Sequence, residues 1–336
     1  NITMQPFRAL VTDMLDDSQK TEGFVIQTFL INLGAVIGAL LPLIMTWCGV
    51  SDAAVEGGVS RHIAYSYYIG GGILLLTVLV TAFKVKEYPP AEFAMYNGSE
   101  ETAVEEKKPG FITLMKNIPS TMLQLGVTQF FSWAALFLMW NYLKPLITSS
   151  FIDAGGTMVN TGAAETWTGV LNAVYPVPAC IASIFMTQIA NRFGNKPVYA
   201  ACLLSGALGY LGLTLIDNQY LMMIPMVFIG IAWAGILAMP YSILSRAIAA
   251  RSSGAYMGIF NFTITIPQIV MGLVGGSIVL AVKNAILSGS DYAALSAVEK
   301  VTVDSQAATW MIGIAALFML LLREGKRNEI SIYNYQ

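Results

Sequence analysis

Uncharged polar side chains recur at helical spacing inside the apolar segments of this chain. Asn261, Thr265 and Gln268 follow one another at i, i+4 and i+7, which places them on one face of an α-helix. Their amide and hydroxyl groups can exchange hydrogen bonds with a small ligand, and we predict that they contact one. The alternative is that they join one helix to another, a common use of polar residues in membrane helices.

Two further segments combine a polar side chain with an aromatic ring. Gln129 and Trp133 are four residues apart, and Asn141 follows two turns later. Asn172 and Tyr175 lie about one turn apart, directly before two prolines that predict a kink or a break. Ligand sites typically place a few polar groups among aromatic side chains, so we predict that these five residues contact a ligand. Tyr175 could equally be a packing residue.

The composition excludes several classes of protein. Of 336 residues, 56% are apolar and 11% are charged, whereas about a quarter are charged in an ordinary soluble domain. The net charge of −2 leaves no basic excess for a nucleic-acid backbone. Cys48, Cys180 and Cys202 are odd in number and widely spaced, so we expect buried packing residues rather than a metal or redox site. The apolar segments carry no carboxylate pair and no His or Cys cluster, so we expect no enzyme.

Long stretches without Asp, Glu, Lys or Arg define the predicted fold. A helix needs about 17 to 25 residues to cross the hydrocarbon core of a membrane, and these stretches are too long for membrane strands. We therefore predict an all-α, polytopic membrane helical bundle. The eight stretches are Gly23–Ser51, His62–Phe83, Asn117–Leu143, Thr166–Asn191, Pro197–Ile216, Asn218–Ser245, Ser252–Val282 and Ser305–Leu322.

Lysine and arginine residues predict the orientation of the bundle. Cytoplasmic loops carry an excess of these residues, and fourteen of the eighteen in this chain fall on one set of loops. We therefore expect both ends of the eight-span set, including the C-terminus, to be cytoplasmic. The four basic residues assigned to the external side are Arg61, Lys144, Lys283 and Lys300.

A polar segment divides the spans unequally. Residues 85–116 contain a run of charged residues and few large apolar side chains, which is typical of a linker. The linker separates residues 1–84, with two spans, from residues 117–336, with six spans and a tail. Because internal repeats of membrane proteins are expected to be equal in size, we expect residues 1–84 to be the remainder of a six-helix half.

Five motifs resemble one family of membrane proteins. Asn1–Asp13 has the pattern Asn-x3-Gln-Pro-x-Arg-Ala-Leu-x2-Asp and resembles the end of helix four in the sucrose and glycoside cation symporters of the major facilitator superfamily. Thr128–Phe137 is similar to helix seven of the bacterial disaccharide members, and Pro240–Leu244 and Gly258–Gln268 are similar to helices ten and eleven. Asn191–Lys196 resembles the basic turn between helices eight and nine. The resemblance implies a major facilitator fold with helices four to twelve present and the N-terminus truncated.

The resemblance implies a secondary active transporter that moves a sugar or disaccharide together with a proton or sodium ion by alternating access. It implies no cofactor and no bound metal. The expected partners are the sugar and the lipid bilayer, and the expected state is a monomer in the inner or plasma membrane. Arg8, Asp13 and Arg192 would then act in gating or coupling near the cytoplasmic face. Alternatively, Arg8 is only a topology signal, and Asp13 caps the next segment.

Two other functions stay open. The solute could be a lysolipid-like amphiphile, or the protein could be a sugar sensor that transports nothing. In addition, no acidic residue falls inside the eight stretches, so the residue that couples transport to a cation is not identified.

Overall fold

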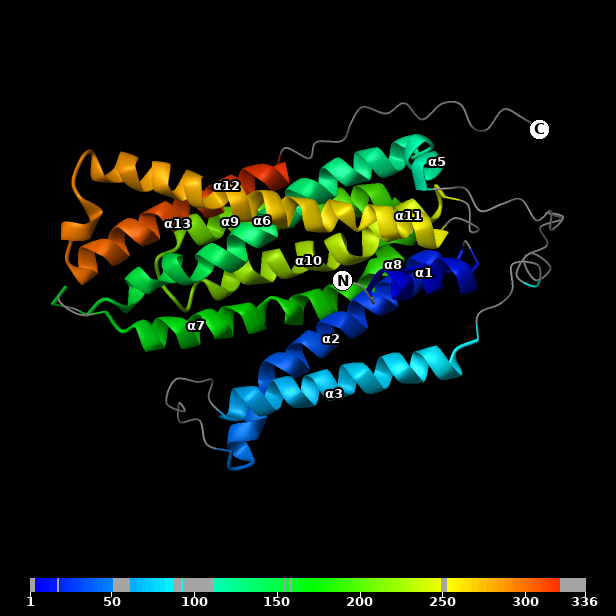
Figure 1. The fold of residues 1–336 in the computed structure, drawn as a ribbon, viewed down its shortest axis with the longest axis horizontal. Coiled ribbons are helices and arrows are strands. Elements are labelled where there is room, and N and C mark those ends of the chain that lie inside the picture. Colours follow the sequence, from blue (N-terminus) through cyan, green and yellow to red (C-terminus); the bar gives the residue numbers. More distant parts are fainter. Residues whose placement is uncertain are drawn as a thin grey trace.

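The computed structural model describes residues 4–16, 18–50, 61–86, 92, 111–153, 155–156, 159–248 and 253–320. Within these residues, the regular elements are helices and one isolated antiparallel bridge between Ile152 and Val159. The long helices run along the longest axis of the molecule (Figure 1). Eight helical segments are long and apolar enough to cross a membrane, which confirms the predicted all-α membrane bundle.

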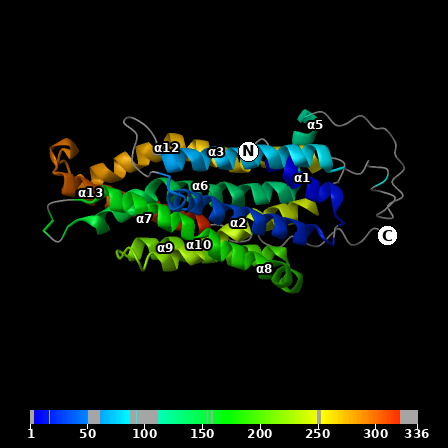
Figure 2. The same ribbon diagram turned by 90° about the horizontal axis from the view of Figure 1, so that it is seen from below.

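The helices follow one another up and down through the bundle. A span of 20 residues covers about 30 Å, the thickness of a hydrocarbon core. The long helix α3 packs against α2 at the edge of the bundle (Figure 1 and Figure 2). The helices are α1 (Met4–Met14), α2 (Lys20–Trp47), α3 (Arg61–Lys84), α5 (Phe111–Lys116), α6 (Ser120–Thr148), α7 (Thr161–Val174), α8 (Pro176–Phe193), α9 (Asn195–Leu215), α10 (Met223–Ser245), α11 (Ser253–Phe260), α12 (Phe262–Leu287) and α13 (Ala297–Leu320), with the short 3-10 helices η1 (Ser149–Phe151) and η3 (Tyr292–Ala294).

Two of the spans consist of two consecutive helices. α7 ends at Val174 and α8 begins at Pro176, so a break falls at Tyr175. This is the break that the prolines predicted, because proline fits the first turn of a helix better than its interior. At Asn261, between α11 and α12, the backbone stays helical, with φ −60° and ψ −24°, and the Asn261 N–H donates to the Met257 carbonyl oxygen at 3.1 Å. The sequence did not indicate this division of the span.

The last span begins earlier than the sequence predicts. α13 starts at Ala297, eight residues before the predicted start, and contains Glu299 and Asp304. Both acidic residues lie outside the eight uncharged stretches, so the residue that would couple transport to a cation stays unidentified. Asp304 Oδ1 lies 2.6 Å from Lys283 Nζ on α12 and accepts a 2.9 Å hydrogen bond from the Tyr292 hydroxyl. Burial and the Asp304 carboxylate raise the pKa of Tyr292, so its hydroxyl stays protonated and keeps donating near neutral pH.

The three cysteines differ in exposure. Cys202 is buried, as predicted, and Cys180 is half-buried. Cys48 is exposed and directly follows the last residue of α2. The prediction of a buried packing residue is therefore wrong for Cys48, because its apolar segment extends beyond the packed part of the bundle.

Most described basic residues lie at the end of the bundle where α2 begins, here called the Lys20 end. Eight described basic residues lie there and four lie at the opposite end, here called the Trp47 end. On this asymmetry we predict that the Lys20 end is cytoplasmic. The predicted linker lies largely outside the described residues, so the boundaries at 84 and 117 stay predictions. The eight are Arg8, Lys20, Lys84, Lys86, Lys116, Arg192, Lys196 and Arg246, and the four are Arg61, Lys144, Lys283 and Lys300.

Glycines let α10 pack closely against its neighbours. A Cβ atom added at Gly209 of α9 would lie 2.8 Å from the Pro225 carbonyl oxygen. A Cβ atom added at Gly230 of α10 would meet the Tyr175 carbonyl oxygen and lie 2.6 Å from Pro178 Cγ. A backbone atom cannot move aside as the end of a flexible side chain can, so these positions require glycine.

We predict that Gly230→Ala destabilises the protein. The added methyl group would overlap the Tyr175 carbonyl oxygen, and overpacking of this kind costs about 1 to 3 kcal/mol. Gly72→Ala on α3 is the matched control, because no atom lies within 4 Å of its added Cβ. Thermal unfolding in detergent should give a lower midpoint for Gly230→Ala than for Gly72→Ala. Equal midpoints would contradict the close packing.

We also predict that Cys48 reacts with a membrane-impermeant maleimide in intact cells. It is exposed at the Trp47 end, which the distribution of basic residues assigns to the outside. Cys48→Ser should abolish this labelling. In the Cys48→Ser background, Asn191→Cys, at an exposed position of the Lys20 end, should react only after permeabilisation. Labelling of Asn191→Cys in intact cells would reverse the orientation.

Candidate functional site

Four aromatic side chains meet inside the bundle and are here called the aromatic cluster. Trp133 and Trp140 come from α6, Tyr175 from the α7–α8 break and Trp233 from α10. The Trp233 ring centroid lies 5.6 Å from that of Trp133, 5.9 Å from Trp140 and 6.1 Å from Tyr175, each pair edge to face. Trp133 and Trp233 are close to the midpoints of their helices. The cluster therefore lies at mid-depth and draws on three spans.

Three buried polar atoms, on an aromatic-cluster residue or within one turn of one along its helix, have no hydrogen-bond partner. Trp133 Nε1 and Gln129 Nε2, one turn apart on α6, are donors without an acceptor. Gln129 Oε1 accepts a 3.3 Å hydrogen bond from the Tyr199 hydroxyl, which orients that amide. Asn172 Oδ1 is an acceptor without a donor, because its Nδ2 donates to the Thr168 carbonyl oxygen at 3.1 Å. Since buried polar atoms are normally satisfied, each of these three atoms is a candidate partner for a polar ligand.

The other predicted ligand-binding residues are half-buried or exposed. Asn141 is exposed on α6, and its Nδ2 donates to the Phe137 carbonyl oxygen at 2.7 Å. Asn261 is half-buried between α11 and α12, and the Thr265 hydroxyl donates to its carbonyl oxygen at 3.2 Å. Gln268 is half-buried on α12. In the described part of the chain, neither Thr265 nor Gln268 hydrogen-bonds the aromatic cluster, so their contact with a ligand stays a prediction.

At the Lys20 end, four polar side chains join α2 to α9 and α10 and are here called the polar latch. The Thr21 and Ser242 hydroxyls lie 2.6 Å apart. Asn195 Nδ2 donates to Ser242 Oγ at 2.7 Å and to Thr21 Oγ1 at 3.3 Å. Arg246 Nη2 donates to Thr21 Oγ1 at 2.9 Å. Because Thr21 and Ser242 are buried, water competes little for these bonds.

Arg8 is buried against the residue that precedes Ser242. Its guanidinium carbon lies 4.5 Å from the centroid of the Tyr241 ring, and 1% of its surface is exposed. Tyr241 also packs against Phe24 of α2 and Phe260 of α11, with ring centroids 5.9 and 5.6 Å away. A cation is attracted to the face of an aromatic ring, so Arg8 holds α1 against α10. None of its three side-chain nitrogens has a hydrogen-bond partner.

The other two predicted gating residues take no part in that contact. No nitrogen of Arg8 is hydrogen-bonded, so Arg8 does not donate to Asp13. Arg192 is exposed in the last turn of α8, with its guanidinium carbon 5.3 Å from the Phe193 ring centroid. A positive side chain is favourable at the C-terminus of a helix. All three residues lie at the Lys20 end, and their roles in gating stay predictions.

Trp140, Trp233 and the polar latch were not predicted as site residues from the sequence. Trp233 carries a usable signal, because a tryptophan in the middle of an apolar span is too deep to be an interfacial anchor. The polar latch carries none, since Thr21 and Ser242 are 221 positions apart. Among the described residues, no three His, Cys, Asp or Glu side chains are placed to hold a metal ion.

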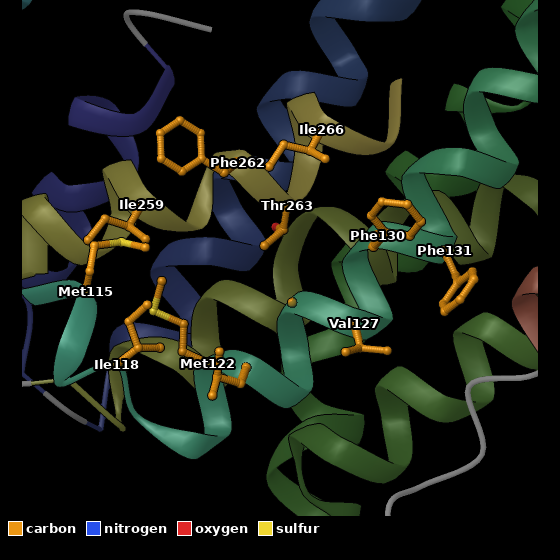
Figure 3. Close-up of a pocket in the computed structure, with 12 residues that line it drawn as sticks. Met115, Ile118, Met122, Val127, Phe130, Phe131, Ile259, Phe262, Thr263 and Ile266 are labelled. Atoms are coloured by element: carbon orange, nitrogen blue, oxygen red, sulfur yellow. The ribbon is translucent and has the colours of Figure 1, made fainter. Parts of the chain in front are cut away.

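An apolar groove of about 450 Å³ lies between α5–α6 and α11–α12 (Figure 3). It shares no residue with the aromatic cluster. Thr263 is the one polar side chain among its lining residues, and its hydroxyl donates to the Phe260 carbonyl oxygen at 2.7 Å. The groove suits a hydrocarbon chain, because it presents no unpartnered polar group.

Comparisons with known proteins identify the family. The sequence profile of the Major Facilitator Superfamily matches residues 125–329. Two solved structures share the fold: FucP, a major facilitator superfamily transporter, in the outward conformation, and a variant of the Escherichia coli fucose:proton symporter FucP. Each is 15% identical with a TM-score of 0.58; the match covers 95% of this chain and 72% and 73% of those chains. No curated protein was found to match the chain.

The match to the Major Facilitator Superfamily profile spans more than half of the residues of this chain. The chain therefore belongs to the major facilitator superfamily of multi-pass membrane transporters.

Proposed function

We propose that this transporter moves a sugar, such as a disaccharide, together with a proton or a sodium ion. The observation that carries the proposal is the aromatic cluster with its unpartnered polar atoms. Aromatic rings suit the apolar faces of a sugar ring. Trp133 Nε1 and Gln129 Nε2 offer donors, and Asn172 Oδ1 offers an acceptor. A hydroxyl group both donates and accepts, so a polyhydroxylated solute can satisfy all three.

Transport by alternating access would require the Lys20 end to open and close. The polar latch and the Arg8–Tyr241 contact hold α1 and α2 against α9 and α10 at this end. We infer that these contacts close the path to the cytoplasm and break when the solute is released. Symport with a cation is what the resemblance to the sucrose and glycoside symporters implies, and the likeness in fold to a fucose:proton symporter is compatible with it.

A lysolipid-like amphiphile is the second candidate solute. The apolar groove between α5–α6 and α11–α12 could hold its hydrocarbon chain. That groove offers no partner for a sugar hydroxyl, whereas the aromatic cluster does. The two candidates therefore depend on different parts of the molecule.

Uptake into proteoliposomes tests the proposed function. The full protein is given radiolabelled sucrose under an imposed proton gradient or sodium gradient, with maltose or lysophosphatidylcholine as competitor. Gradient-dependent accumulation that maltose reduces supports sugar symport. Competition by lysophosphatidylcholine alone would favour the amphiphile. Sucrose binding without uptake would indicate a sensor.

We predict that Asn261→Ala and Gln268→Ala each raise the half-saturation concentration for sugar uptake about two- to twelve-fold. Loss of one hydrogen bond to an uncharged hydroxyl costs roughly 0.5 to 1.5 kcal/mol. Thr77→Ala is the control, because Thr77 is exposed on α3 and donates to the Ile73 carbonyl oxygen of its own helix at 2.9 Å. Normal kinetics at normal expression would assign Asn261 and Gln268 to helix packing.

We predict that Arg8→Ala impairs uptake but leaves sugar binding intact, because a gate residue changes the conformational equilibrium without touching the solute. Arg8→Lys should restore uptake only in part, since a compact ammonium cannot stack on Tyr241 as a planar guanidinium does. Lys84→Ala, which removes an exposed charge at the same end, should behave as wild type. The measurements are sucrose binding by purified protein and uptake in vesicles. Loss of both in folded Arg8→Ala would place Arg8 in the solute or ion site.

A further inference from the structure

Asn32 lies near the middle of α2 and has no exposed surface. Its Nδ2 donates a 2.8 Å hydrogen bond to the Thr28 carbonyl oxygen, one turn earlier on the same helix. Its Oδ1 is buried without a hydrogen-bond partner. A carbonyl oxygen can accept only from the amide nitrogen, so this bond sets the orientation of the side chain. Asn32 therefore presents an acceptor oxygen to its surroundings.

Asn172 on α7 repeats this arrangement. Its Nδ2 donates to the Thr168 carbonyl oxygen, and its Oδ1 has no partner. The hydroxyl of each preceding threonine is also bound within its helix, since Thr28 donates to Phe24 at 2.8 Å and Thr168 donates to Ala164 at 2.7 Å. In each Thr-x3-Asn segment, the threonine hydroxyl and the asparagine Nδ2 therefore donate within their own helix, and the buried asparagine Oδ1 has no partner.

The register of α2 and α10 places Asn32 at the level of the aromatic cluster. Thr21, near the start of α2, meets Ser242, near the end of α10, in the polar latch. The two helices pack against each other, so residues after Thr21 on α2 lie beside residues before Ser242 on α10. Asn32 lies eleven residues beyond Thr21, and Trp233 lies nine residues before Ser242. These separations correspond to about 16 Å and about 14 Å along a helix.

We propose that Asn32 is a solute-recognition residue, whose Oδ1, together with that of Asn172, accepts hydrogen bonds from hydroxyl groups of a sugar. Asn172 is one turn from Tyr175, which contacts Trp233, and α2 packs against both α7 and α8. The inference rests on the proposed function and describes how the same site selects its solute. Because an amide oxygen accepts and does not donate, the two positions favour donating hydroxyls over carboxylate or phosphate groups.

A sodium ion is the competing occupant, because amide oxygens also bind cations. Hard cations collect about six oxygen ligands, usually including carboxylates. No Asp or Glu lies within one turn of either asparagine along its own helix. The neutral pair therefore fits hydroxyl donors better than a cation.

Binding of sucrose analogues to the purified full protein tests the proposal. The probe is sucrose, or maltose if sucrose does not bind, together with its monodeoxyfluoro analogues, in which fluorine replaces one hydroxyl and cannot donate. Quenching of tryptophan fluorescence reports binding, because three of the four side chains in the aromatic cluster are tryptophans. The variants are Asn32→Ala, the shape-matched Asn32→Leu and Asn172→Ala. Gln188→Ala, at an exposed position on α8, is the amide control.

Asn32→Ala should weaken disaccharide binding about two- to twelve-fold. One analogue should bind the wild type more weakly by a similar factor. That analogue and the parent sugar should then bind Asn32→Ala equally, because two changes that remove the same hydrogen bond are not additive. Asn172→Ala should give the same result with a different analogue, and Gln188→Ala should match the wild type.

Three outcomes would overturn the proposal. If Asn32→Ala, or Asn32→Leu where the alanine variant does not fold, weakens the parent sugar and every analogue equally or not at all, Asn32 has no recognition role. If binding requires sodium and is insensitive to the fluorine substitutions, the oxygens hold a cation. If the wild type binds neither sucrose nor maltose, the proposed function fails, and this inference fails with it.

Discussion

The absence of water inside a membrane is the constraint on which this structure depends. A polar group there must bond within the protein, because an unpartnered donor or acceptor in an apolar medium is costly. Many hydroxyl and amide side chains in the spans meet this requirement by donating to the carbonyl oxygen one turn earlier, as Ser183, Thr168 and Asn141 do. Such a bond needs no second helix, so it does not influence how the spans are arranged.

Side chains that bond away from their own helix determine that arrangement. Thr21, Ser242 and Asn195 connect three helices through hydrogen bonds, while Arg8 connects a fourth through an aromatic ring. These contacts can break without unfolding any span, because every helix keeps its backbone bonds. The contact at Gly230 differs, since α10 there packs directly against the backbone of Tyr175, between α7 and α8. Rigid spans joined by such replaceable contacts suit a protein whose helix groups move as units.

The bundle could be predicted from the sequence because each membrane helix is encoded as one local apolar segment. The exceptions have separate causes. Ser296 and Glu299 exchange hydrogen bonds at the start of α13, so its early start is marked by a local capping pair that a search for uncharged stretches passes over. Cys48 lies in an apolar segment, but it is exposed.

From the sequence, the candidate site could be predicted only where its residues are neighbours on one helix. Gln129 and Trp133 are four residues apart, so helical periodicity alone shows that they share a face. Trp233 and Asn32 reach the same level of the bundle through the pairing of α2 with α10, which no local pattern encodes. Burial also separates residues that look alike in the sequence. Asn32 and Asn141 make the same bond to their own helices, yet Asn141 is exposed and Asn32 is buried. What distinguishes a recognition residue from an ordinary polar residue in a span is therefore the packing around its free atom, not the residue type.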